Sequence, residues 1–309
     1  MRNAFAQQLT ELARQDERLV LLSGDIGNRL FDRLKAECPG RFINCGVAEG
    51  NMIGVATGLA LAGLRPVCYT IAPFLTYRCL EQIRVDLCYH HVPVTLVGTG
   101  AGLAYASLGA THHSCEEMGM LRLLPGLAVV APGDPWEVRA ALRAAVQHPG
   151  PVYLRIGKKG EPAVHAAEPA FAIGRALRLR EGTDVCLLNA GTLLPIALQA
   201  AELLSADGLG AGVYSFHTLK PLDETVLATE FTRCRLVVTL EEHSVLGGLG
   251  GSVAEWLADQ PTASVRARLM RCGTRDEFLH LTCEQGAART HFGLTPEAIA
   301  SRVRQALSA

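Results

Sequence analysis

The most informative stretch of the chain is Gly46-Val47-Ala48-Glu49-Gly50-Asn51-Met52-Ile53-Gly54-Val55-Ala56-Thr57-Gly58-Leu59-Ala60-Leu61-Ala62-Gly63. The carboxylate of Glu49 precedes small and apolar residues at helical length, and such a helix is predicted to pack closely on all sides. A carboxylate in that setting loses hydration, so we expect its pKa to be raised and the group to serve as a proton donor. The alternative is an exposed Glu that the helix dipole stabilises in the first turn. Physical chemistry alone leaves both interpretations open.

Short, β-rich apolar runs lie on both sides of this stretch and alternate with helix-length segments. In the first half of the chain they occupy residues 20–22, 65–69, 94–97, 127–130 and 152–154. In the second half they occupy residues 185–188, 212–216, 236–240 and 265–269. Such alternation predicts an α/β fold with mainly parallel sheets. We therefore expect doubly wound domains with helices on both faces of each sheet.

A break in this rhythm separates the two halves. The segment from Lys158 to Pro169 is charged, contains prolines and has no periodic pattern, as is typical of an interdomain linker. The length of 309 residues also suits two domains of roughly 150 residues each. We predict a first domain at residues 1–165 and a second, smaller domain at residues 166–309.

The composition excludes several classes of protein. Hydrophobic residues make up 49% and charged residues 19%, with a formal net charge of -1, so no basic surface for nucleic acid is predicted. No apolar core of a signal peptide and no run of about 18 apolar residues occurs, so we expect a cytoplasmic protein without a membrane segment. The ten cysteines form no Cys-x-x-Cys pair, which argues against a zinc site and a disulfide framework.

The run from Gly46 to Met52 resembles the pyrimidine-binding motif of transketolases and deoxyxylulose-phosphate synthases, and residues 68–84 continue the resemblance. In that family the Glu of the motif hydrogen-bonds the aminopyrimidine ring of thiamine diphosphate. The bond promotes the imino tautomer, which generates the reactive ylide of the cofactor. The resemblance assigns this role to Glu49.

The same resemblance implies that aromatic residues after this helix stack on the aminopyrimidine ring. Phe74 is the first choice, and Tyr69 and Tyr77 are further candidates for cofactor binding. The alternative for each is an aromatic core residue at a strand end.

A second motif, Gly109-Ala110-Thr111-His112-His113, follows a glycine-rich strand end, where parallel sheets usually bind ligands. Adjacent histidines without partners at matched spacing are poor metal ligands, so no metal site is predicted in this chain. The motif is similar to Gly-Pro-Thr-His of the family, which implies that His112 contacts the substrate carbonyl or moves protons near neutral pH. His113 is a weaker candidate for substrate binding, and a satisfied loop histidine is the alternative for both. Leu108 stands where transketolases carry an Asp that contacts a sugar hydroxyl, which argues against a standard pentose-phosphate donor.

Residues 151–159 stand where the family places phosphate-binding arginines, and they offer Arg155 followed by Lys158 and Lys159. Arg155 is the predicted substrate contact, because a lysine binds phosphate only as a point charge and lacks the bidentate fork of a guanidinium.

Residues 216–223 and 241–251 resemble signature stretches of the transketolase C-terminal domain, which implies a role chiefly in assembly. Within the second stretch, the neighbours Glu241 and Glu242 are expected to point apart along a strand rather than to form an acid/base pair.

One element of the family is missing from the chain. The diphosphate-binding domain of these enzymes carries a Gly-Asp-Gly stretch and paired asparagines, whose oxygens hold Mg²⁺. Here Gly-Asp pairs occur only at Gly24-Asp25 and Gly133-Asp134, without the asparagines. The resemblance therefore implies a split enzyme, in which a diphosphate-binding partner subunit holds the Mg²⁺ and the diphosphate in an α2β2 complex.

The predicted function is two-carbon ketol transfer from a ketose, phosphorylated or not, to an aldehyde acceptor, by a transferase that is active only with its partner subunit. Two alternatives stay open. One is a 2-oxo-acid decarboxylating enzyme, either a deoxyxylulose-phosphate synthase or the beta subunit of a 2-oxo-acid dehydrogenase. The other is a scaffold protein that kept the fold and lost the chemistry.

Overall fold

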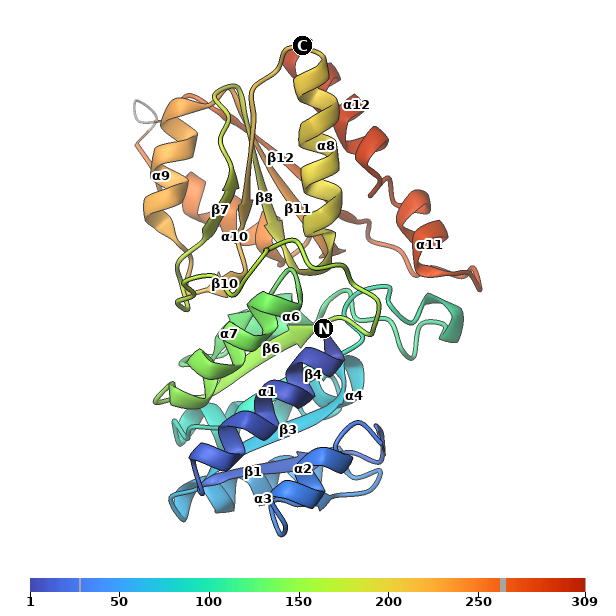
Figure 1. Ribbon diagram of the computed structural model, residues 1–309. Coiled ribbons are helices and arrows are strands. Elements are labelled where there is room, and N and C mark those ends of the chain that lie inside the picture. Colours follow the sequence, from blue (N-terminus) through green and yellow to red (C-terminus); the bar gives the residue numbers. More distant parts are fainter. Residues whose placement is uncertain (28, 262–264, 309) are drawn as a thin grey trace.

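The computed structural model describes residues 1–27, 29–261 and 265–308 of the chain. It contains two β-sheets flanked by helices, and Figure 1 shows the N-terminal half below the C-terminal half. Parallel pairs predominate in both sheets. The predicted α/β class is therefore confirmed.

The first sheet contains seven strands in the order β10-β5-β6-β4-β3-β1-β2. Six of them come from the first half of the chain and pair in parallel: β1 (Leu19–Ser23), β2 (Phe42–Asn44), β3 (Arg65–Ile71), β4 (Thr95–Thr99), β5 (Ala128–Val130) and β6 (Val152–Ile156). Every residue of β1, β4 and β6 is buried. Burial on both faces explains the continuous apolar runs Leu19–Leu22 of β1 and Val152–Leu154 of β6.

Two hydrophobic clusters cover the opposite faces of this sheet. One face packs against α1 (Arg2–Gln15), α2 (Asp32–Glu37) and α7 (Pro135–Gln147), of which α1 and α7 lie side by side (Figure 1). The other face packs against α3 (Glu49–Leu61), α4 (Ala72–Thr76), the π-helix η1 (Ile83–Tyr89) with the short α5 (Leu80–Gln82) before it, and α6 (Glu117–Arg122).

The prediction that α3 packs on all sides is wrong for this chain, because only one face of the helix is buried. Its residues Met52, Ile53 and Ala56 are buried against the sheet. The opposite face is exposed in this chain, with Val55 38% and Leu61 64% accessible. The reason is geometric, because a helix laid on a sheet buries only one stripe unless a further element covers the other.

The second sheet contains five strands in the order β12-β11-β8-β9-β7. These strands are β7 (Leu177–Arg180), β8 (Val185–Ala190), β9 (Ala211–Ser215), β11 (Leu236–Ser244) and β12 (Arg268–Thr274). Only β7 pairs in the antiparallel direction among them. The flanking helices are η3 (Gly191–Leu193), α8 (Leu194–Ala206), α9 (Glu224–Arg233), α10 (Leu249–Ala258), α11 (Gln285–His291) and α12 (Pro296–Ser308).

One strand of the second half belongs to the first sheet. The β10 strand (Thr218–Lys220) pairs with β5 in the antiparallel direction, with Thr218 opposite Val130 and Lys220 opposite Val129. The ammonium of Lys220 also donates to the carbonyl of Arg122 at 2.9 Å. The two halves therefore share a hydrogen-bonded sheet. The domain boundary at residue 165 stays a prediction.

All ten cysteines are free thiols, and eight of them are buried. Within residues 1–27, 29–261 and 265–308, no helix has the length and apolar character needed to cross a membrane.

Candidate active site

Glu49 begins α3 at the carboxyl edge of the first sheet. Gly46 makes the turn from β2 into α3, where its φ of +67° lies in the left-handed region that favours glycine. The Glu49 side chain is buried, with only 6% of the residue exposed. Its Oε2 accepts a hydrogen bond from Nη1 of Arg78 at 3.3 Å. The predicted residue is thus a buried carboxylate with a cationic partner, at the edge where parallel sheets bind ligands.

Arg78 and Phe74 form the next part of the site. The guanidinium carbon of Arg78 lies 4.0 Å from the centroid of the Phe74 ring, which is a cation–π distance. Phe74 lies in α4, and its ring is 5.1 Å from the His112 ring at an angle of 68°. Sequence reasoning gave Arg78 no role, although its position four residues after Phe74 places both on one side of a helical turn.

His112 lies on the loop between β4 and α6. Its Nδ1 is 2.9 Å from Oγ1 of Thr111, and its ring is 6.0 Å from that of Tyr105. Partial burial lowers the pKa of His112 below its ordinary value, and the nearby His113 and Arg78 act in the same direction. The imidazole is therefore neutral at neutral pH and can accept or donate one hydrogen bond according to its tautomer.

Lys158 continues this series of contacts through Tyr105. Its ammonium lies 4.6 Å from the centroid of the Tyr105 ring. Successive contacts thereby link Glu49, Arg78 and Phe74 through His112 and Tyr105 to the ammonium of Lys158. Together they form a continuous row that offers a carboxylate, aromatic faces, an imidazole and a positive end.

Two predicted site residues are core residues instead. Tyr69 is fully buried in β3, where its ring stacks on Phe5 at 5.3 Å and meets Phe31 edge-on at 5.1 Å. The expectation that Tyr69 stacks on a cofactor is therefore wrong, because its strand position points the side chain into the cluster under α1.

Arg155 is the second correction. Its side chain is inaccessible and forms an ion pair with Glu117, which is equally buried. The predicted phosphate contact is therefore wrong, because the guanidinium is committed to internal partners and no part of it reaches solvent.

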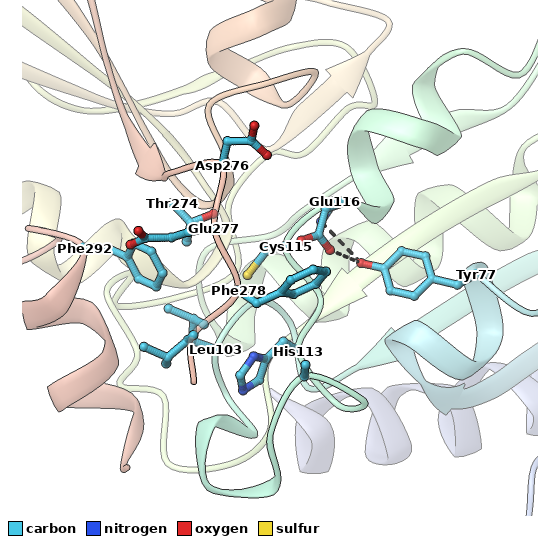
Figure 2. A pocket seen from close by; sticks show the side chains of 12 residues that line it. Tyr77, Leu103, His113, Cys115, Glu116, Thr274, Asp276, Glu277, Phe278 and Phe292 are labelled. Atoms are coloured by element: carbon cyan, nitrogen blue, oxygen red, sulfur yellow. Dashed lines mark hydrogen bonds between the residues drawn. The ribbon is translucent and has the colours of Figure 1, made fainter. Parts of the chain in front are cut away.

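Tyr77 and His113 line a cavity of about 520 Å³ where the two halves of the chain meet (Figure 2). The Tyr77 hydroxyl donates to Oε2 of Glu116 at 2.6 Å. The lining combines residues of the first half with the end of β12, the segment after it and the residue after α11, and includes Leu103, Cys115, Glu116, Thr274, Phe278 and Phe292. His113 is buried there, whereas His112 faces Phe74, so the adjacent histidines have different surroundings. The binding roles of Tyr77 and His113 stay predictions.

Glu241 and Glu242 point apart, as predicted. Glu241 accepts hydrogen bonds from the amides of Leu249 and Gly250 at the start of α10, at 2.7 and 2.8 Å. Glu242 instead accepts from the amide of Leu103 in the first half of the chain at 2.7 Å. In the described part of the chain, no three His, Cys, Asp or Glu side chains are grouped as metal ligands.

Comparison with known proteins agrees with this architecture. Residues 1–161 match the family model of the transketolase pyrimidine-binding domain, and residues 174–299 match that of the transketolase C-terminal domain. The 6-deoxy-6-sulfo-D-fructose transketolase subunit SqwH of Clostridium sp. (strain MSTE9) is 36% identical over 97% of this chain and 92% of its own length. One of the subunits of the apulose-4-phosphate transketolase of Phocaeicola vulgatus is 36% identical over 96% of this chain and 94% of its own.

A solved structure described as a split gene transketolase, inactive beta4 tetramer, superimposes with a TM-score of 0.88. It is 35% identical and covers 99% of this chain and 97% of its own. The two domains, the full-length relatives and the shared architecture lead to one conclusion: the chain belongs to the transketolase family, as the subunit of a split enzyme that carries the pyrimidine-binding and C-terminal domains.

Proposed function

We propose that this chain is the pyrimidine-binding subunit of a thiamine-diphosphate-dependent transketolase that moves a two-carbon ketol unit from a ketose to an aldehyde. The observation that carries the proposal is the buried Glu49 carboxylate at the sheet edge, in one row with Phe74 and His112. The relatives of matching length, which are named as transketolase subunits, favour ketol transfer over decarboxylation of a 2-oxo acid.

The residues of the row fit the aminopyrimidine half of the cofactor. Glu49 offers a buried carboxylate to a ring nitrogen, and the half-buried Phe74 offers a face on which a flat ring can stack. Arg78 compensates the charge of Glu49 from the side. When bound, thiamine diphosphate supplies the nucleophilic carbon that ketol transfer requires.

His112 and Lys158 provide the contacts for the donor. The neutral imidazole of His112 hydrogen-bonds the oxygen of the donor carbonyl, and Lys158 meets a negatively charged terminus at the end of the row. Leu108, which is 52% exposed, presents an apolar surface where a carboxylate would bind a sugar hydroxyl. The donor class that fits is therefore a ketose with a terminal phosphate or sulfonate, and the names of the two relatives contain a sulfo-sugar and a sugar phosphate.

The partner in the proposal is a diphosphate-binding subunit that holds Mg²⁺, in an α2β2 assembly. The exposed stripe of α3, which includes Asn51, Gly54, Val55, Gly58 and Leu61, begins next to Glu49 and supports this part of the proposal. Small and apolar residues there permit close approach of another subunit at the carboxylate that the cofactor must reach.

Reconstitution with the partner tests the function. The isolated chain, supplied with thiamine diphosphate and Mg²⁺, should show no ketol transfer, and the two-subunit complex should be active with an anionic ketose. Ketol transfer by the isolated chain would overturn the split-enzyme proposal. Release of carbon dioxide from pyruvate by the complex would replace ketol transfer with the decarboxylating alternative.

The Glu49→Gln variant tests the role of the carboxylate, with Glu81→Gln, an exposed position on α5, as the matched control. Glu49→Gln should lower kcat of the complex by about 10²-fold or more, in the range expected for loss of a proton-transferring group. Unchanged turnover would favour the scaffold alternative or another activating residue.

A further inference from the structure

The loop that carries His112 is closed at its base. It runs from Gly100 to Glu116 between β4 and α6, and includes the short 3₁₀ helix η2 (Ala106–Leu108). A bridge joins Gly102 and Ser114, whose amide donates to the carbonyl of Gly102 at 2.9 Å. The position of His112 therefore depends on what holds this base.

Strand β11 of the C-terminal domain contacts both sides of the base. The carboxylate of Glu242 accepts from the amide of Leu103 at 2.7 Å, at the start of the loop. At its end, the carbonyl of Cys115 accepts from the amide of Ser244 at 2.7 Å. Glu242 is itself held from α11 by Arg289 and by Gln285, whose Nε2 donates to Oε1 at 2.8 Å.

Arg155 completes the same junction from β6. Its Nη2 donates to the carbonyl of Ser114 at 2.6 Å and to the carbonyl of Glu242 at 2.8 Å. Its Nε donates to the carboxylate of Glu117, which begins α6. One buried guanidinium thus connects the end of the loop, the following helix and the other domain, and all of these bonds are charge-assisted.

The fit between the loop base and Glu242 is close. Gly102 has a φ of +58°, and a Cβ atom there would lie 2.5 Å from the carbonyl oxygen of Glu242 and 2.6 Å from its Oε1. No side chain fits between the two, so the loop base can approach β11 only with glycine at this position.

We infer that Arg155 and Glu242 are positioning residues, through which the C-terminal domain fixes the loop of His112 for catalysis. The part of this inference that concerns catalysis rests on the function proposed above, because it takes His112 as a substrate contact. The part that concerns the position of the loop depends only on the hydrogen bonds of Arg155 and Glu242. Catalytic groups must be held close to their productive geometry, and small displacements cost large factors in rate.

Two variants remove the contacts with little loss of packing. In the first, Glu117→Met and Arg155→Met are combined, because replacing both members of a buried ion pair by apolar residues of similar volume is often tolerated. In the second, Glu242→Leu removes the acceptor of the Leu103 amide, and Glu242→Gln serves as its conservative counterpart, since it keeps an acceptor. Glu255→Gln is the matched control, because it breaks the Arg122–Glu255 ion pair between α6 and α10, which does not involve the loop.

Hydrogen exchange of the folded, isolated chain gives the first readout. Peptides that cover residues 103–114 should exchange about tenfold faster, or more, in the double Met variant and in Glu242→Leu. They should exchange at the rate of the unsubstituted chain in Glu242→Gln and Glu255→Gln. Unchanged exchange in the double Met variant would overturn the inference. If Glu242→Leu does not fold, the double Met variant alone is the test.

Activity of the reconstituted complex gives the second readout. The double Met variant should lower kcat about tenfold or more, and Glu255→Gln should leave kcat unchanged. Faster exchange with unchanged kcat would also overturn the inference, because the geometry of the loop would then not matter for turnover. If the unsubstituted complex transfers no ketol unit, the proposed function fails, and exchange alone decides whether the two residues hold the loop.

Discussion

Replacing His217 should remove a pH dependence from the stability of the chain. This histidine follows β9 at the junction of the two domains, is fully buried, and stacks on Phe171 with ring centroids 4.0 Å apart. Its Nδ1 lies 2.8 Å from Oγ1 of Thr218, and its Nε2 has no hydrogen-bond partner within the described residues. Burial lowers the pKa of His217 to about 3.

The sign and size of the effect follow from proton binding. Below about pH 6.5 the unfolded chain protonates His217, whereas the folded chain takes up this proton only near pH 3, so stability falls as the pH falls through this window. At 1.36 kcal/mol per pKa unit, the loss between pH 7 and pH 5 is about 2 kcal/mol.

Glu137, at the same junction, gives the free energy of unfolding the opposite dependence on pH. It is fully buried, and burial raises its pKa to about 7. The unfolded carboxyl loses its proton above about pH 4.5, so this contribution to stability falls as the pH rises, by about 2 kcal/mol between pH 5 and pH 7. The two slopes offset each other in the unsubstituted chain, so only a comparison with variants separates them.

Urea unfolding at pH 7 and pH 5 provides the assay. The free energy of unfolding of the unsubstituted chain, relative to that of His217→Gln, should fall by about 2 kcal/mol from pH 7 to pH 5. Relative to Glu137→Gln it should rise by about the same amount. A difference from His217→Gln that is equal at both pH values would refute the burial of a neutral imidazole at this junction.

Three further substitutions test single contacts. Tyr69→Phe should change the free energy of unfolding by less than about 1 kcal/mol and leave turnover of the complex intact, because the hydroxyl has no partner among the described residues; a large loss of turnover would restore a cofactor role. Gly102→Ala should lower the free energy of unfolding by about 1–3 kcal/mol more than Gly46→Ala, which shares a positive φ but meets no described atom within 4 Å; equal losses would show that Glu242 moves aside. Lys158→Met should raise KM for a phosphorylated ketose about tenfold and leave KM for a neutral ketose unchanged; equal effects on both donors would exclude a charge contact.

The sequence predicted the fold wherever strands are buried on both faces. Short apolar runs such as those of β1 and β6, when they alternate with helix-length segments, indicate buried parallel strands. The strands that were missed, β2, β7 and β10, are short, are not buried throughout and lie at sheet edges, so they lack such runs. The final strand begins at Arg268, three residues after its predicted start.

The placement of two candidate residues could be expected where local sequence sets the geometry. Glu49 begins the helix that follows β2, and Phe74 lies in the helix that follows β3, as expected for residues at the carboxyl edge of a parallel sheet; their roles stay predictions. Arg155 was misassigned because its partner Glu117 lies 38 residues away, and nothing in the local sequence shows that pairing. Tyr69 was misassigned because β3 extends to Ile71, which places the tyrosine inside the strand rather than at its end.

The pairing of β10 with β5 limits how this gene product could be divided. A fragment that ended in the linker would leave β5 as an open edge, with the amides and carbonyls of Val129 and Val130 available to any other extended chain. Such an edge invites aggregation. A natural or engineered split between the two domains is therefore disfavoured, whereas a split before the pyrimidine-binding domain leaves this sheet whole.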